Sequence, residues 1–432
     1  MMDVLQEHLD EASFLWSQWE RALVSPLHDL ADTAECEERL LAHVDGLVVG
    51  GEAAVSELLL PALETDEPER ISAAAVALLS GGGKHELEET LAVLDSGDEV
   101  QRAGVGRAMA LSEREGLQEV LLKRLSAEDP ALQAVAFQVL AFRGTVPQET
   151  RTQWLYRDAV EPVIAALWGP GPLSRDVVQS VLPQLLVDPR SGVREAATMA
   201  GLVSGARAAW KTCRKVAEEG GAGQRLALVA MALGGDERDA EWLAGLLSKE
   251  PLRADVLWAL GFSGYALAAE ACLEWMGGED KTSALAGEAF SAITGLQLQG
   301  EYRKPAKEEE EALIPLEEED LDADLVPGPE ASLAVPVREA VERWWQKGRK
   351  NFERGARYLR GTRLDAGVLL DALGREPMRR RPVLALELAI RSRGAHLLQT
   401  RAFTRRQRAE LSAVLKDRGT VSMNAFSKLF GG

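Results

Sequence analysis

Aromatic residues are scarce in this chain of 432 residues: Phe, Trp and Tyr together make up 5% of it, although hydrophobic residues make up 46%. Strands favour aromatic and β-branched residues, whereas the abundant Ala and Leu lose little conformational freedom on entering a helix. The hydrophobic content is enough for a core and too high for a disordered chain. The composition therefore predicts an all-α fold.

Cysteine is also rare. Cys36, Cys213 and Cys272 lie far apart and form no CxxC pair, which argues against a disulfide framework or a zinc site and predicts free thiols in a reducing compartment. The chain has no apolar run of the ~20 residues that a membrane span requires. Its first residues lack the basic segment and apolar run of a signal peptide. We therefore expect a cytoplasmic protein with no membrane span.

Positive charge is in deficit, and the net charge is −19. Residues 1–300 carry 24 basic and 47 acidic side chains (net −23), residues 301–330 carry 3 and 12 (net −9), and residues 331–432 carry 22 and 9 (net +13). Such a balance disfavours binding to nucleic acid or anionic lipid. It predicts instead a protein partner with a basic patch.

Helix-start signals recur along the chain at intervals of 29 to 33 residues. Most contain Asp or Glu, several are followed by Pro, and each precedes an Ala/Leu/Val-rich segment; they stand at residues 66, 98, 129, 158, 188, 221, 250 and 280. Asp caps the first amides of a helix, and Pro is tolerated at its first position. Two helices in about 30 residues cannot bury their apolar faces alone, so neighbouring pairs must stack. The period predicts a HEAT-like α-solenoid.

Composition divides the chain into four predicted regions. Residues 1–49 form an N-terminal helical cap, residues 50–300 the repeat solenoid, residues 301–335 an acidic linker containing proline, and residues 336–432 a basic C-terminal helical region. The low hydrophobicity and the acidic runs of residues 301–330 are typical of a solvated linker.

No pattern of reactive residues stands out. Ser80-Gly81-Gly82-Gly83-Lys84-His85 resembles a phosphate-binding loop but has His85 where Ser or Thr is needed. The five histidines show no metal-ligand spacing, and His43 is best explained as a hydrogen-bonded helical residue that braces the cap. We therefore expect no catalytic residue, no metal, no cofactor and no enzymatic activity.

The basic C-terminal region holds the candidate partner-binding residues, which are Trp344, Trp345, Arg357, Tyr358, Arg405 and Arg406. Trp and Arg dominate interface hot spots, so these residues could form a recognition surface. The alternative, which we favour, is that the basic region docks on the acidic repeats with one Trp buried as an anchor, since adjacent helical residues point about 100° apart. Nucleic-acid binding by the arginines is a weaker third hypothesis.

Two resemblances extend this interpretation. The repeats resemble the short HEAT-like repeats of phycobilisome lyases. The chain also resembles a proteobacterial family that is common in myxobacteria, through pieces spread over most of its length: His8 with Phe14-Leu15-Trp16, Leu40–Leu47, Leu260-Gly261-Phe262, Ala286–Phe290 with Ile293-Thr294-Gly295, Trp344-Trp345, Arg357–Gly361 and Leu386–Ala389. The second resemblance implies a setting in toxin-delivery gene neighbourhoods such as type VI secretion clusters, and it implies no catalytic residue.

The functional hypothesis is a protein-binding scaffold, an adaptor, chaperone or accessory protein for a secreted toxin or effector. One alternative is an immunity protein that covers a toxin's active site. Another is a lyase-like HEAT-repeat enzyme. The sequence leaves the oligomeric state open.

Overall fold

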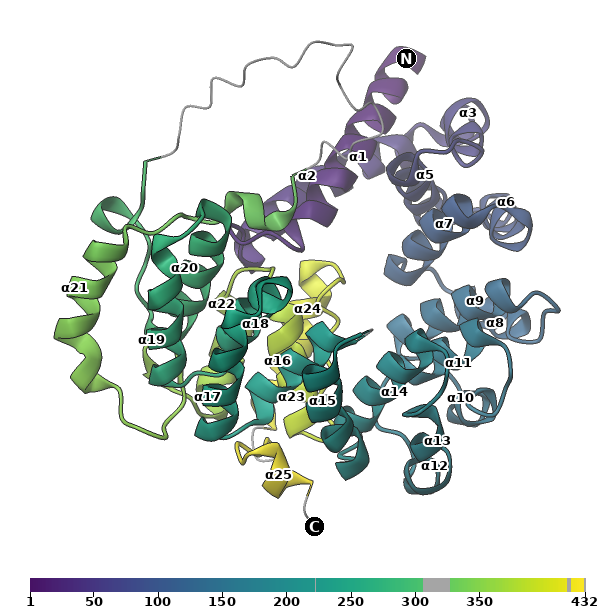
Figure 1. The fold of residues 1–432 in the computed structure, drawn as a ribbon. Coiled ribbons are helices and arrows are strands. Elements are labelled where there is room, and N and C mark those ends of the chain that lie inside the picture. The colour runs from purple at the N-terminus through teal and green to yellow at the C-terminus, as the bar shows by residue number, and fades with distance from the viewer. Residues whose placement is uncertain (222, 306–326, 418–420, 431–432) are drawn as a thin grey trace, which may run out of the picture. The chain divides into compact units, whose positions relative to one another are not determined.

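The computed structural model describes residues 1–221, 223–305, 327–417 and 421–430 (Figure 1). Helices account for nearly all of its regular structure. Within the described part of the chain, the sheet is a two-residue hairpin, β1 (Tyr358–Leu359) and β2 (Thr362–Arg363). The all-α prediction is confirmed.

The chain forms two compact units. Unit 1 comprises residues 1–223, 373–423 and 428–432, and unit 2 comprises residues 224–372 and 424–427. The predicted boundaries therefore need correction. The repeats from 50 to 300 are divided after Gly223. The predicted C-terminal region from 336 to 432 belongs partly to each unit, because its later helices pack on helices of residues 1–223.

Unit 1 contains the N-terminal helices, the first repeats and the last long helices of the chain. Its helices are α1 (Met2–Ala22), α2 (Leu30–Val49), α3 (Gly51–Ala54), α4 (Leu60–Ala62), α5 (Pro68–Gly81), α6 (Lys84–Ser96), α7 (Glu99–Leu111), α8 (Leu117–Arg124), α9 (Pro130–Arg143), α10 (Gln148–Trp154), α11 (Val160–Leu167), α12 (Arg175–Ser180), α13 (Leu182–Leu185), α14 (Ser191–Val203), α15 (Arg207–Glu219), α23 (Arg381–Arg391) and α24 (Thr404–Lys416).

A helix begins within three residues of every predicted repeat start. Asp98 shows why, because its carboxylate accepts a hydrogen bond from Gln101 N while the Gln101 side chain accepts one from Asp98 N. Asp129 caps Ala131 N ahead of Pro130 in the same way. The helices that follow these starts pack in sequence, α5 on α7, α7 on α9, α9 on α11 and α11 on α14. The HEAT-like solenoid prediction is confirmed.

The two N-terminal helices of unit 1 lie where a helical cap is expected. Helices α1 and α2 pack along each other and cover α5, the first helix of the repeat stack. His8 and His43 join the pair, with 3.1 Å between their Nδ1 atoms, and the His8 ring lies against Gly46, where a Cβ would come within 2.8 Å. The glycine in this motif thus permits close contact between the two helices.

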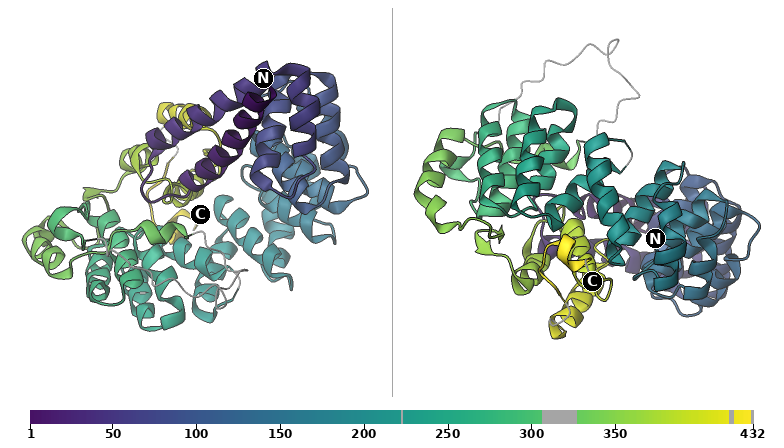
Figure 2. Two further views of the ribbon diagram at one scale, coloured as in Figure 1. Left: turned by 90° about the horizontal axis from the view of Figure 1, so that it is seen from above. Right: turned by 60° about the horizontal axis from the view of Figure 1, so that its bottom comes forward.

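The C-terminal segment of unit 1 returns to the N-terminal helices. Met378 N donates to His28 O at 2.8 Å and Arg379 N donates to Ser25 O at 3.0 Å, so the segment before α23 lies along the α1–α2 turn. Helix α23 packs on α14, and α24 packs on α2. The left view of Figure 2 shows yellow C-terminal helices beside the purple N-terminal pair.

Unit 2 contains further helix pairs and the hairpin. Its helices are α16 (Gln224–Gly234), α17 (Glu237–Gly245), α18 (Arg253–Leu260), α19 (Ala266–Glu274), α20 (Asp280–Thr294) and α21 (Arg338–Gly348), with most of α22 (Ala366–Arg375) and the start of α25 (Phe426–Leu429). Helix α18 packs between α16 and α20.

The predicted linker of residues 301–335 is described only at its ends. Arg303 and Pro336 form an isolated antiparallel bridge, and Lys304 N donates to Val335 O at 2.8 Å. Residues 306–326, which hold most of the predicted acidic runs, lie outside the described residues. Among the described residues, no helix combines the length and the hydrophobicity that crossing a bilayer demands.

Candidate binding pocket of unit 1

Trp344 and Trp345 are placed in unit 2 on the face of α21 that meets α20. Trp345 is buried between Phe290 and Phe352, with ring centroids 5.5 and 5.0 Å away. Trp344 is partly exposed, and its ring centroid lies 6.1 Å from that of Phe290. Trp345 is therefore a core residue that anchors α21, and only Trp344 presents part of its ring to solvent.

Arg357 holds the carboxyl ends of two consecutive repeat helices together. Its guanidinium donates to Leu233 O at the end of α16 (2.9 Å) and to Phe262 O and Ser263 O after α18 (2.9 and 2.7 Å). A cation at helix carboxyl ends also interacts favourably with their dipoles. The next residue, Tyr358, is buried, and its N–H donates to Gly264 O at 2.7 Å. Both residues thus have structural contacts within unit 2.

Arg405 and Arg406 lie in unit 1, at the start of α24. Arg405 forms an ion pair with Glu113, which follows α7, and both side chains are 78% exposed. Arg406 donates to Phe142 O at 2.6 Å, and its guanidinium carbon lies 5.0 Å from the Phe142 ring centroid. The predicted candidates are therefore divided between the units, with four in unit 2 and these two in unit 1.

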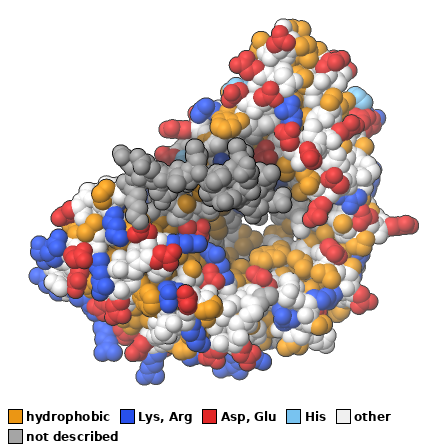
Figure 3. Space-filling model, turned by 45° about the horizontal axis from the view of Figure 1, so that its top comes forward, with side chains coloured by type: hydrophobic (Ala, Val, Ile, Leu, Met, Phe, Trp, Pro, Cys, Tyr) orange, Lys and Arg blue, Asp and Glu red, His pale blue; other side chains and the backbone are white. Residues whose placement is uncertain are grey.

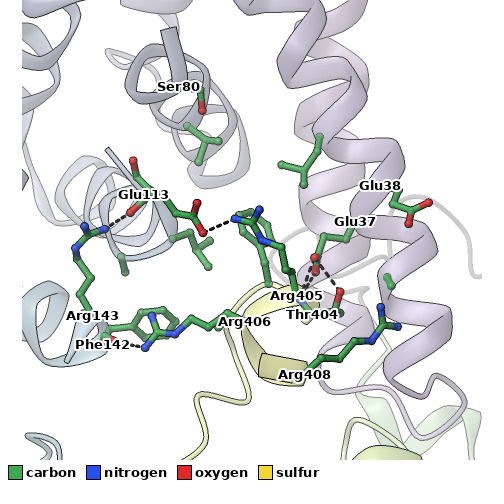
Figure 4. Close-up of a pocket in the computed structure, with 18 of the residues that line it drawn as sticks. Glu37, Glu38, Ser80, Glu113, Phe142, Arg143, Thr404, Arg405, Arg406 and Arg408 are labelled. Atoms are coloured by element: carbon green, nitrogen blue, oxygen red, sulfur yellow. Dashed lines mark hydrogen bonds and ion pairs between the residues drawn. The ribbon is translucent and has the colours of Figure 1, made fainter. Parts of the chain in front are cut away.

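Arg405 and Arg406 line a pocket of about 810 Å³ in unit 1 (Figure 4). Residues of α2, α5, α7, α9 and the start of α24 surround it. The charged residues of its lining are Glu37, Glu38, Glu113, Arg143, Arg405, Arg406 and Arg408, and apolar side chains lie among them. A volume of this size is in the range of ligand-binding pockets.

Glu37 fixes the start of α24 on α2. Its carboxylate accepts hydrogen bonds from Thr404 N (2.9 Å to each oxygen), Thr404 Oγ1 (3.0 Å) and Trp19 Nε1 (3.2 Å). The side chain is buried, and burial raises the pKa of its carboxyl group, although these hydrogen bonds oppose the rise. Glu37 was not among the residues predicted from the sequence, although it stands at helical spacing with Thr33, Leu40 and Val44 on the buried face of α2.

Arg143, at the end of α9, supplies a further cation to the pocket. Its guanidinium donates to Ser112 O, and among the described residues its buried Nε has no hydrogen-bond partner. Burial lowers the pKa of Arg143 first, and the positive charge of Arg406 lowers it further. The cations of the pocket are thus only partly neutralised.

Other features of the described residues limit the chemistry of the pocket. No group of three or more His, Cys, Asp or Glu side chains among them is arranged to hold a metal ion. Cys213 and Cys272 are free and fully buried, and burial raises the pKa of each thiol to about 12. Such thiols are unreactive. The lining of the pocket itself offers guanidinium, carboxylate, hydroxyl and apolar groups.

No family model and no curated protein matches this chain. Two solved structures are similar to it, each at 17% sequence identity. One is human deoxyhypusine hydroxylase in complex with glycerol, with 66% of this chain and 98% of that chain covered and a TM-score of 0.25. The other is an engineered protein, with 95% and 92% covered and a TM-score of 0.23.

The hydroxylase match corrects one prediction. We expected from the sequence that the chain is not an enzyme, yet one of the solved structures to which it is similar is an enzyme. The exclusion of enzymatic activity is therefore withdrawn. Neither match bears on a substrate or a partner.

Proposed function

We propose that this chain binds a protein partner through the pocket of unit 1, as an adaptor, chaperone or accessory protein for a secreted toxin or effector in the cytoplasm. The observation that carries the proposal is the pocket itself, an open site where repeat helices and the chain's own α24 present charged and apolar groups together. Mixed sites of this kind suit protein side chains. The toxin-delivery setting rests on the family resemblance described above.

The surroundings of the pocket favour a partner with a basic patch. Residues 1–100 carry 23 acidic and 4 basic side chains, and two helices of this segment, α2 and α5, border the pocket. On the face drawn in Figure 3, acidic side chains are dispersed among basic, neutral and apolar ones and do not form one continuous patch. Dispersed charge steers association more than it fixes a single contact, so binding should slow as salt increases.

A steric substitution tests the proposal without changing charge. Ser80 lies exposed on α5 at the pocket, so Ser80→Trp should fill it, whereas Ser96→Trp places the same ring on exposed α6. We expect affinity capture from the native cell at low salt to retain a partner with the wild type and with Ser96→Trp, and to lose it with Ser80→Trp. Equal capture by all three proteins would refute a role for the pocket. Rescue of a cell that expresses the toxin would indicate neutralisation in place of delivery.

A further inference from the structure

Glu113 lies between two guanidinium groups of the pocket. Figure 4 shows Arg143 on one side of it and Arg405 on the other, and Glu113 forms its ion pair with Arg405. Both members of that pair are 78% exposed, and exposed ion pairs of long side chains are weak. A carboxylate at this position is therefore favoured by two cations but held loosely.

The cations around Glu113 are not fully satisfied by it. Arg143 is partly buried, the charge of Arg406 acts against its protonation, and its Nε has no hydrogen-bond partner among the described residues. The pocket is lined by four arginines and three glutamates, and one of the arginines, Arg406, is paired with Glu410 on its own helix at 2.8 Å. One of those glutamates, Glu37, is already occupied in capping α24.

The two guanidinium groups beside Glu113 identify the kind of anion that fits. Those of Arg405 and Arg143 suit one carboxylate, whereas a polyphosphate would face Glu38 and Glu113 at the same pocket. Apolar side chains also line the space, among them Leu41, Val76 and Leu111. A carboxylate flanked by apolar groups is the chemistry of an acidic residue in a peptide segment.

We propose that the pocket binds one carboxylate of a partner's peptide segment between Arg405 and Arg143, with apolar side chains of the segment against the pocket wall. Glu113 is then the internal competitor, and it releases Arg405 when the ligand carboxylate binds. This inference rests on the proposed function and adds the chemistry of the bound segment. A partner that is basic overall would insert a single acidic residue here.

The proposal predicts effects of opposite sign for two substitutions. Arg405→Gln removes a cation that holds the ligand and should weaken binding by about tenfold, the effect of losing one charge-assisted contact. Glu113→Gln removes the competitor and should strengthen binding by a fewfold. Arg175→Gln removes an exposed charge from α12, outside the pocket, and should change nothing. A purely structural ion pair would make Arg405→Gln and Glu113→Gln act in the same direction.

The probes are heptapeptides selected from a random library on the immobilised full chain, with affinities measured by fluorescence anisotropy. We expect the selected peptides to share a Glu or Asp beside apolar residues, and replacement of that acid by its amide to weaken binding about tenfold. Failure to enrich acidic peptides, or changes of the same sign in the two variants, would overturn the inference. Displacement of the peptides by millimolar inorganic phosphate would indicate that the pocket is a site for small anions and not for peptide carboxylates.

The two proposals can fail separately. If Ser80→Trp abolishes partner capture but the peptides show no acidic preference, the pocket binds protein and the carboxylate inference is wrong. If Ser80→Trp leaves capture intact, the proposed function fails, whatever the peptides show.

Discussion

Glu37 is a buried carboxylate whose hydrogen-bond donors come from both ends of the chain. Burying a charge is costly unless it is hydrogen-bonded, and here Trp19 and Thr404 together offer three N–H or O–H groups. All three groups can donate, so they match an acceptor-only carboxylate. The contact also caps the first amide of α24, which no side chain of the helix itself does.

Glu37→Gln should therefore destabilise the protein. A glutamine places an NH₂ group against at least one of these donors and leaves it unpaired, at a cost of about 1–3 kcal/mol. The free energy of unfolding of unit 1, measured by urea titration, tests this. Glu38→Gln is the matched control, because Glu38 is the exposed neighbour on the same helix. Equal stability of the two variants would show that Glu37 does not hold α24.

The pH dependence of the same pair of proteins has a defined sign. Because the pKa of Glu37 is raised above its ordinary value of 4.5, the folded state binds this proton more tightly than the unfolded state does. The contribution of Glu37 to the free energy of unfolding is then fully present below pH 4.5 and falls as the pH rises through the raised pKa. The stability difference between wild type and Glu37→Gln should decrease from pH 4.5 towards pH 7.

At the scale of elements, the sequence motifs that carry the family resemblance lie far apart in the chain but contact one another in pairs in the structure. His8 on α1 contacts Gly46 on α2, and Trp345 on α21 packs on Phe290 of α20. The hairpin segment that begins at Arg357 binds the carbonyls at the ends of α16 and α18. These motif residues thus make contacts between helices. Packing within the units accounts for them, and no partner surface is needed to explain them.

Arg357→Lys tests the contact between Arg357 and the carbonyl groups at the ends of α16 and α18. One ammonium group cannot reach the three carbonyls that the guanidinium fork binds, so we expect unit 2 to lose roughly 2–4 kcal/mol of stability. Hydrogen exchange should increase at the carboxyl ends of α16 and α18. Arg354→Lys is the control, since Arg354 is 89% exposed on the same segment. Unchanged hydrogen exchange in the Arg357→Lys variant would show that Arg357 does not hold the ends of these two helices together.

Local signals were readable from the sequence, and distant contacts were not. Asp98 and Asp129 indicate helix starts because the side chain of a capping residue accepts a hydrogen bond from an amide two or three residues further along the chain. Glu37 and Thr404 are 367 residues apart, so no period or propensity connects them. Arg405 and Arg406 were found as candidates from composition alone, whereas Glu113 and Arg143 became visible only when the repeats brought them to the same pocket.

For the chain as a whole, the opposite net charges of the repeats and the C-terminal region predict that electrostatic attraction attaches the C-terminal region to the repeats. Within unit 1, hydrogen bonds contribute more to this attachment than exposed ion pairs do. Exposed pairs such as Arg401 with Glu20 and Arg405 with Glu113 exist, but buried or backbone hydrogen bonds hold the segment: Thr404 to Glu37, and Met378 N to His28 O. Buried contacts are screened by salt much less than exposed ones.

Salt should therefore leave this attachment in place. Raising NaCl from about 0.1 M to about 1 M shortens the Debye length from about 10 Å to about 3 Å and weakens the exposed pairs. We expect the hydrogen-exchange protection of α24 to change little, and Glu37→Gln to reduce it at both salt concentrations. A marked loss of protection in wild-type α24 at high salt would mean that the acidic repeats hold the basic segment mainly by long-range attraction. The buried carboxylate would then be secondary to the net charge of the two regions.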